Sequence, residues 1–342
     1  METTTSDLAA SALERELGAG SESLEGRHAV VFGGAGFIGS HLVAALRAAG
    51  ASVLVADLAD PRRPLPEGVG LVRCDVRERI DLDPGGAEPL VFNLAAVHRT
   101  PGHPDHEYFE TNVAGAENVT DFCERNGVRS LFFTSSIAVY GPTEVAVTEE
   151  SELRPTSAYG RSKAQAEDIH RAWLRRGEGR RLVIVRPAAV FGPGEGGNFT
   201  RLAGALRKGT FLYPGRRDTL KGCGYVEDLV SSLLFMWGRA APDVVYNFGY
   251  PQPPTLEGIC EAFVRVGHLH RPMGTVPSGP VMTAARVLNA AGLRTFDPQR
   301  VQKLFLSTNV VPARLVAEGF EYGTDLEGAI TRWHAGTRGE FV

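Results

Sequence analysis

The sequence predicts an α/β fold in which a doubly wound parallel sheet carries a smaller, mostly helical lobe in the C-terminal part of the chain. Short β-rich apolar runs alternate with helix-length segments from residue 28 onward, the pattern of parallel strands covered by helices on both faces. A chain of 342 residues also exceeds the usual size of a single hydrophobic core. After Arg186 and Pro187 the alternation gives way to loop-forming stretches such as FGPGEGGN, where we expect the second lobe to begin.

The expected elements follow one another along the chain. The strands are His28 to Phe32, Ser52 to Ala56, Gly70 to Cys74, Leu90 to Leu94, Ser130 to Thr134 and Leu182 to Val185. The clearest helices end near a glycine or a basic residue, and they are Gly36 to Ala49, Glu107 to Asn126 and Ser157 to Arg175. A helix near Tyr225 to Trp237 and a strand at Val244 to Asn247 are expected to return to the sheet. Later helical segments are expected at Val281 to Ala291 and Asp325 to His334.

This order divides the chain into three parts. Residues 1–26, rich in Ser, Thr, Glu and Gly, are expected to form a polar tail in which Leu8, Leu13 and Leu17 allow a short amphipathic helix. Residues 27–190 are expected to form the sheet domain, with a return near 222–256. Residues 191–221 and 257–342 then make up the second lobe.

Composition excludes several classes of protein. The formal net charge of -4 leaves no basic excess for a phosphate backbone, so we expect no nucleic-acid partner. No run approaches the roughly 18 apolar residues of a membrane span. The four cysteines are scattered without a CxxC pair, and the first residues lack the order of a secretory signal. We therefore expect a cytoplasmic protein. The close histidine pairs lack an evident third ligand, so no metal site is expected.

A glycine-rich segment, FGGAGFIG, joins the first expected strand to the first expected helix. Gly33, Gly34, Gly36 and Gly39 satisfy both the GxxGxxG and the GxGxxG spacing. Glycine lets the chain turn tightly and approach a pyrophosphate, and the helix N-terminus offers free N–H groups to the anion. In this context the segment predicts the phosphate loop of a Rossmann dinucleotide-binding domain.

Asp57 ends the next strand, 18 residues after Gly39. An acidic side chain at about this spacing meets the adenosine ribose hydroxyls, and its charge repels a 2′-phosphate. This favours NAD over NADP. Arg62 and Arg63 follow closely, and NADP remains the alternative if their loop folds back.

A tyrosine and a lysine four residues apart, Tyr159 and Lys163, lie on one face of an expected helix. A nearby ammonium and a positive nicotinamide ring both favour the phenolate, which makes a tyrosine usable as an acid or base. Upstream, an apolar strand stops at Ser135 and Ser136, at the edge where ligands bind in open α/β folds. Ser136 is expected to hydrogen-bond the reacting oxygen.

Taken in order, FGGAGFIG, Asp75-Val76, NLAA, TSSIAVYG, YGRSK and RPAAVFGPG resemble the extended short-chain dehydrogenase/reductase superfamily, in particular its NAD-dependent nucleotide-sugar epimerase/dehydratase family. The resemblance covers nearly the whole chain after residue 27. It implies a Rossmann domain with NAD, a C-terminal lobe that binds a nucleotide sugar, and a catalytic set of Ser136, Tyr159 and Lys163. The residues implied to bind the cofactor are Gly33, Gly36, Phe37, Ile38, Asp57, Asp75, Val76, Leu94, Ala95, Ala96, Tyr159 and Lys163.

Several later stretches resemble a subgroup of nucleotide-sugar and glycan epimerases, which implies that His98, Ser136, Asn198 and Lys221 face the substrate. Lys221 stands where many members carry arginine, and Ala189 where many carry asparagine. Phe32 replaces the threonine that usually opens the glycine motif. The sugar is therefore left open by the sequence.

The resemblance implies an epimerase, with Tyr159 taking a sugar proton as NAD takes hydride, to give a transient keto-sugar, with inversion expected at C4. A 4,6-dehydratase is disfavoured, because Ser136-Ile137-Ala138 stand where its acid–base pair is expected. The alternative is an NAD(P)-dependent nucleotide-sugar ketoreductase or dehydrogenase; a non-catalytic dinucleotide-binding protein ranks below it.

Assembly is also implied by the resemblance. The helices at Glu107 to Asn126 and Ser157 to Arg175 resemble those of a four-helix homodimer interface. The segment Pro280 to Leu293 has a modest apolar face that allows peripheral membrane contact. Packing in the core or in an interface is preferred for it, because it lacks a basic polar face.

Overall fold

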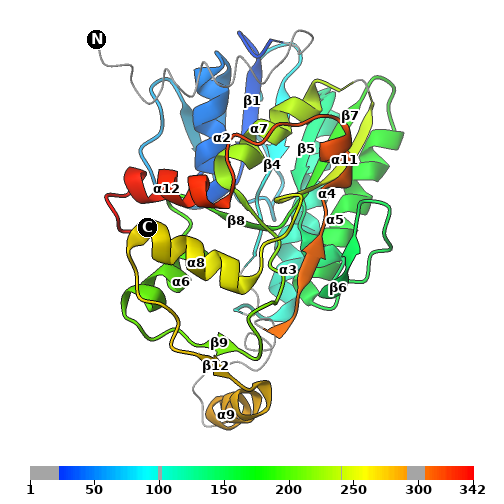
Figure 1. Cartoon of the computed structure of the whole chain (residues 1–342). Coiled ribbons are helices and arrows are strands. Elements are labelled where there is room, and N and C mark those ends of the chain that lie inside the picture. The colour runs from blue at the N-terminus through cyan, green and yellow to red at the C-terminus, as the bar shows by residue number, and fades with distance from the viewer. Residues whose placement is uncertain (1–22, 99–101, 240, 291–304) are drawn as a thin grey trace, which may run out of the picture.

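The computed structural model describes residues 23–98, 102–239, 241–290 and 305–342. A seven-stranded sheet in the order β11-β7-β5-β4-β1-β2-β3 lies at its centre (Figure 1), and all of its neighbouring strands are parallel. Its strands are β1 (His28–Phe32), β2 (Ser52–Asp57), β3 (Gly70–Arg73), β4 (Leu90–Asn93), β5 (Ser130–Thr134), β7 (Arg181–Pro187) and β11 (Asp243–Phe248). The predicted α/β fold class is confirmed.

Helices cover both faces of this sheet, because its central strands are apolar on both sides. In β1, Val31 packs into the core beneath α2 (Phe37–Ala48) and α7 (Val226–Trp237). Its neighbours Val30 and Phe32 point the other way, toward α4 (Ala114–Arg125) and α5 (Ala158–Arg175). The carboxyl ends of the strands are thereby left as the edge at which a site can form.

The second lobe is held by an aromatic core beyond that edge. Phe191, Phe263 and Trp333 are fully buried in it. Three helices surround them: α6 (Asn198–Arg207), α8 (Leu256–Gly267) and α12 (Leu326–Gly336). The short parallel pairs are β8 (Ala189–Phe191) with β10 (Cys223–Tyr225), β9 (Tyr213–Pro214) with β12 (Thr275–Val276), and β6 (Thr143–Val147) with β13 (Thr308–Val310). The remaining elements are η1 (Ile137–Val139), α9 (Ser278–Ala290) and α11 (Ala313–Ala317).

One expected helix is interrupted. In place of a single helix over 107–126, the chain forms α3 (Asp105–Asn112) and α4, separated by Val113. The break coincides with a tether, because the Asn112 side chain accepts from the Val97 N–H and donates to the Val97 carbonyl. The expected tail helix at Leu8, Leu13 and Leu17 lies outside the described residues, as does the end of the segment Pro280 to Leu293.

Candidate active site

The glycine loop packs too closely to accept side chains. Gly33 has a φ of +79°, and a Cβ placed on it would lie 2.7 Å from the backbone nitrogen of Ala95. A Cβ on Gly39 would lie 2.3 Å from the Gly33 carbonyl oxygen. Glycine is therefore required here both for a left-handed turn and for the close approach of helix α2 to the loop.

The first turn of α2 presents an anion cradle. Its N-cap, Gly36, supplies no side-chain acceptor. The N–H groups of Phe37, Ile38 and Gly39 have no hydrogen-bond partner among the described residues. Open amides at a helix N-terminus favour a phosphate. The residues present therefore fit the pyrophosphate of a dinucleotide.

Asp57 lies at the end of β2 beside this cradle. Its carboxylate accepts hydrogen bonds from the Ala35 and Ala59 N–H groups, each at 3.0 Å, and keeps lone pairs for further donors. Arg63 contacts the ring of His41 at 3.3 Å. The charge closest to the expected ribose position along β2 is thus a carboxylate, which suits unphosphorylated ribose hydroxyls.

The remaining expected cofactor residues line the neighbouring strand ends. Asp75 follows β3, and the Arg77 side chain that hydrogen-bonds its carboxylate lowers the Asp75 pKa. Val76 is buried under α4, where a Cβ on Gly115 would lie 2.9 Å from it. Leu94, Ala95 and Ala96 follow β4, half-buried and next to Gly33.

Ser136, Tyr159 and Lys163 come from two adjacent elements. Ser136 follows β5 and caps η1, accepting from the Ala138 N–H at 3.1 Å. Its hydroxyl lies near enough to Tyr159, in the first turn of α5, to lower the pKa of that phenol. One turn later, Lys163 is buried; its Nζ donates to the Thr134 carbonyl at 2.8 Å and lies 4.7 Å from the centre of the Phe133 ring.

Burial shifts both titratable groups toward their neutral forms. It raises the pKa of Tyr159 to about 12, against a smaller lowering by the Ser136 hydrogen bond. It lowers the pKa of Lys163 to about 7, with Glu167 pulling the other way. Without ligands, the phenol therefore keeps its proton at neutral pH, and Lys163 is only partly charged.

A buried charged network supports this helix and was not anticipated from the sequence. The Glu167 carboxylate accepts from Ser135 at 2.6 Å and from two nitrogens of Arg186 at 2.8 and 2.6 Å. Arg186 also donates to the Tyr140 hydroxyl, which in turn donates to Asn247. The available signal was a glutamate four residues after Lys163, on the same helical face.

Asn112 and Tyr108 are two further polar residues that the sequence did not single out. Asn112 is buried and donates to the Ser162 hydroxyl at 2.9 Å, which fixes α3 against α5. Tyr108 is buried, with its ring centre 6.1 Å from that of Tyr159. An asparagine within an otherwise regular helical pattern was the signal that pointed to the first.

The three remaining substrate candidates come from separate segments. His98 is exposed after β4. Asn198, exposed at the start of α6, accepts from Arg201 at 2.8 Å. Lys221 is half-buried and donates to the Leu306 carbonyl at 2.7 Å; burial lowers its pKa to about 8, so it stays largely cationic at neutral pH.

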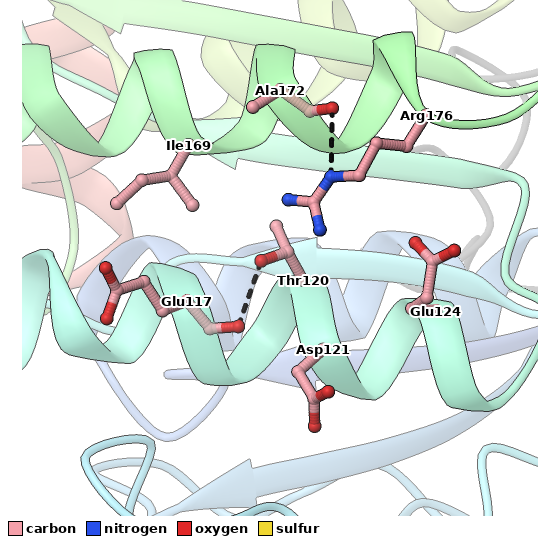
Figure 2. A pocket seen from close by; sticks show the side chains of 7 residues that line it. All are labelled: Glu117, Thr120, Asp121, Glu124, Ile169, Ala172 and Arg176. Carbon is pink, nitrogen blue, oxygen red and sulfur yellow. Dashed lines mark hydrogen bonds between the residues drawn. The ribbon is translucent and has the colours of Figure 1, made fainter.

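A surface hollow between α4 and α5 lies apart from these residues. Figure 2 shows Glu117, Asp121 and Glu124 of α4 on one side of it and Arg176, directly after α5, on the other. Elsewhere, no group of three or more His, Cys, Asp or Glu side chains in the described ranges is arranged to hold a metal ion. None of the helices in those ranges is long and apolar enough to cross a membrane.

Known proteins share this architecture. N-acetyl-α-D-glucosaminyl-diphospho-ditrans,octacis-undecaprenol 4-epimerase of Escherichia coli O157:H7 is 36% identical over 178 residues, which cover 51% of this chain and 54% of that protein. The structure of MoeE5 in complex with UDP-glucuronic acid and NAD is 26% identical, with a TM-score of 0.70 and 91% of this chain and 99% of that one covered. The Thermus thermophilus UDP-glucose 4-epimerase complex with NAD is 25% identical, with a TM-score of 0.69 and the same coverage.

The family model confirms the resemblance drawn from the motifs. The model of the NAD dependent epimerase/dehydratase family matches residues 29–249, which include the glycine loop, the tyrosine–lysine pair and β11. The curated relative described above is matched over only about half of its own length. The chain belongs to the NAD dependent epimerase/dehydratase family.

Proposed function

We propose that this chain is an NAD-dependent nucleotide-sugar epimerase that inverts C4 through a transient keto-sugar, with Tyr159 as the acid and base. The observation that carries the proposal is the pairing of Ser136 with Tyr159 at the carboxyl edge of the sheet, one helical turn from the buried Lys163. The glycine cradle lies at the same edge. Proton transfer and dinucleotide binding therefore converge on one place.

The cofactor side rests on the open amides of Phe37, Ile38 and Gly39 and on the Asp57 carboxylate. These groups would hold the pyrophosphate and the adenosine ribose of NAD. Bound NAD supplies a hydride acceptor and, in its reduced form, a hydride donor. An epimerase needs both in one turnover.

On the protein side, Tyr159 takes the proton from the sugar hydroxyl and later returns it. Ser136 donates to the reacting oxygen and holds it against the phenol. Because burial raises the pKa of Tyr159 to about 12, the phenol becomes a base only beside positive charge. The cationic form of Lys163, one turn away, is the protein's own source of that charge.

A sugar diphosphate fits the substrate side. The solved relatives are described with UDP-sugars, and the Escherichia coli relative is named for a sugar on a polyprenyl diphosphate. Both kinds of molecule share the glycosyl diphosphate. Lys221, cationic at neutral pH, is the candidate for the phosphates, and His98 and Asn198 are candidates for the rest of the ligand.

The test uses purified protein without added cofactor. Bound dinucleotide is released and identified, and the protein is incubated with UDP-, dTDP- and GDP-sugars and with undecaprenyl-diphosphate N-acetylglucosamine. Interconversion of C4 epimers is expected for at least one carrier. Turnover that requires stoichiometric NADH or NADPH would instead establish the ketoreductase or dehydrogenase and overturn the epimerase.

Tyr159→Phe tests the proton-transfer assignment. Removal of the acid–base hydroxyl is expected to lower turnover by about 10³-fold with the fold intact, since positioned acid–base groups contribute roughly 10² to 10⁴. The matched control is Tyr246→Phe, which removes a buried hydroxyl of β11 that is bonded to Ser232. Equal turnover in the two variants would show that Tyr159 is not the acid–base group.

We also propose a homodimer formed through the exposed faces of α4 and α5. The acidic side chains of α4 and Arg176 at the end of α5, around the hollow in Figure 2, offer complementary charges to a second copy. Light scattering is expected to give the dimer mass, and Ala172→Glu on this face is expected to shift it toward the monomer. An unchanged mass for the variant would place the interface elsewhere.

A further inference from the structure

The far end of the second lobe, opposite the sheet, is formed by two segments, 207–217 and 268–290, which we call the lobe tip. They contain β9, β12 and α9, and Figure 1 shows α9 below the rest of the lobe. The β9–β12 pair joins the two segments, and the Phe211 carbonyl accepts from the Met273 N–H at 3.0 Å. The tip is therefore one structural unit.

Exposed apolar side chains gather in this unit. Of the eight large apolar side chains exposed in the described residues, three belong to the tip: Leu212 at 39%, Met273 at 64% and Val287 at 62%. Single exposed apolar residues are ordinary on protein surfaces, whereas several in one region indicate a contact surface. On α9, Ala285 is buried and Val287 faces outward.

The charge of the tip is opposite to that of the chain. Neither segment contains an aspartate or a glutamate, although the whole chain has a net charge of -4. Arg207, Arg216 and Arg217 are neutralised by ion pairs with Glu340, Glu144 and Glu257. Lys208, Arg271 and Arg286 are exposed and form no ion pair with any residue in the described ranges.

We propose that the lobe tip docks on a lipid bilayer that carries anionic phospholipids. Met273 and Val287 would enter the boundary between head groups and acyl chains, and Lys208, Arg271 and Arg286 would pair with the head groups. With 13 residues, α9 lies on the surface, since a span needs about 20. The sequence favoured packing for this segment, and the exposure of Val287 supports the membrane alternative.

Two other occupants fit the tip less well. A second copy would bring one acid-free, cationic tip against another, and like charges repel. Nucleic acid would satisfy the cations, but its phosphate backbone offers nothing to exposed methionine and valine side chains. Of these three occupants, the anionic bilayer matches both the apolar and the basic part of the surface.

The experiment is co-sedimentation of the full chain with vesicles of phosphatidylcholine, alone or mixed with phosphatidylglycerol at about 30%, an anionic fraction that attracts exposed basic side chains. It requires neither sugar nor cofactor. Binding is expected only with the anionic lipid. Met273→Asp combined with Val287→Asp is expected to abolish it. Neutralising Arg271 or Arg286 to glutamine should weaken the partition coefficient about fivefold per charge, and added salt should act the same way.

Val145→Asp is the matched control, because Val145 is 76% exposed but lies on β6, outside the tip. Its binding is expected to equal that of the parent chain, and unchanged thermal unfolding of every variant would exclude misfolding. The proposal is overturned if anionic vesicles do not bind the chain, or if the tip variants bind as well as Val145→Asp. It is also overturned if the tip variants change the oligomeric mass and leave vesicle binding intact. None of these outcomes depends on the proposed epimerase activity.

Discussion

Two consecutive turns of helix α5 treat buried polar groups in opposite ways. In the second, Glu167 is fully buried, and Ser135 and Arg186 hydrogen-bond its two carboxylate oxygens while Arg171 lies 3.3 Å away. In the first, Tyr159 and Lys163 are desolvated with few partners, so burial raises the pKa of one to about 12 and lowers that of the other to about 7. The same helix thus carries one buried charge with complete hydrogen bonding and two titratable groups that burial shifts toward their neutral forms.

This difference separates a residue that supports the structure, Glu167, from two residues proposed to take part in the chemistry, Tyr159 and Lys163. A buried charge with complete hydrogen bonding fixes structure, because moving it breaks several bonds at once. Titratable groups that are buried with few partners respond strongly when a ligand brings new charge. Ser135 and Ser136 show this division between neighbours, since the first donates to Glu167 and the second lowers the pKa of Tyr159.

The largest expected effect comes from breaking the buried ion pair of Glu167 with Arg186. Glu167→Gln leaves the Arg186 guanidinium buried without its counter-charge and should lower the free energy of unfolding by about 3–5 kcal/mol. Urea denaturation measures it. The double variant Glu167→Gln with Arg186→Met removes both charges and should recover part of the loss. If the double variant is no more stable than the additive sum of the single changes, the pair is not coupled.

Lys163→Met removes a buried ammonium group that has few partners. Because burial lowers the Lys163 pKa from its usual 10.5 to about 7, the unfolded chain holds a proton between these pH values that the folded chain lacks. The unfolding free energy of the parent chain therefore rises with pH across this window. Below pH 7 the folded chain bears the full cost of burying the charged Lys163 ammonium. At pH 6, Lys163→Met should therefore have an unfolding free energy about 2–4 kcal/mol above that of the parent. The figure takes about 1.4 kcal/mol for each pKa unit of the shift and subtracts the lost hydrogen bond to Thr134.

The stability advantage of Lys163→Met over the parent chain should vanish near pH 10. The turnover of this variant should be about 100-fold lower than that of the parent. The difference in unfolding free energy between variant and parent, measured at both pH values, cancels the titration of other groups. A difference that is constant with pH would mean that Lys163 keeps its charge in the folded chain.

The smallest effects come from the serine pair. Ser135→Ala should cost about 1–2 kcal/mol of stability, because Glu167 loses a donor, and leave turnover within about twofold. Ser136→Ala should instead lower turnover by about 10²-fold, with a stability loss of about 0.5–1 kcal/mol from the lost cap of η1. Parallel unfolding and rate measurements on the two variants decide the matter. Similar changes in stability and turnover for both variants would contradict the different roles assigned to the two turns of α5.

The sheet was largely predictable from the sequence. Strands buried on both faces are short continuous apolar runs, and six of the predicted strands lie within two residues of the observed ones. The predicted helix and strand near 225–247 are α7 and β11, and β11 pairs with β7. Helix α8 was missed, although Leu256, Ile259 and Phe263 recur at helical spacing, because loop-forming residues flank it.

The site was predictable only where one segment carries it. The glycine loop and the tyrosine–lysine pair are local patterns. The ion pair of Glu167 with Arg186 and the tether of Asn112 to Val97 join residues 19 and 15 positions apart through strand and helix packing. Such partners depend on register and burial, which a single sequence does not display. The roles of all the site residues, Ser136, Tyr159 and Lys163 as well as His98, Asn198 and Lys221, stay predictions.

The pairing of β6 with β13 joins Thr143 to Thr308, and Asn247 donates to the Val311 carbonyl. The first contact joins the C-terminal segment to the strand that precedes the tyrosine helix, and the second joins it to β11. A ribosome adds about 5–20 residues per second, so Tyr159 leaves the tunnel on the order of ten seconds before Val311 does. During synthesis the glycine loop and the strands around it can therefore form before β13 reaches β6. The consequence is an order of assembly in which the dinucleotide-binding strands form first and the pairing of β6 with β13 closes last.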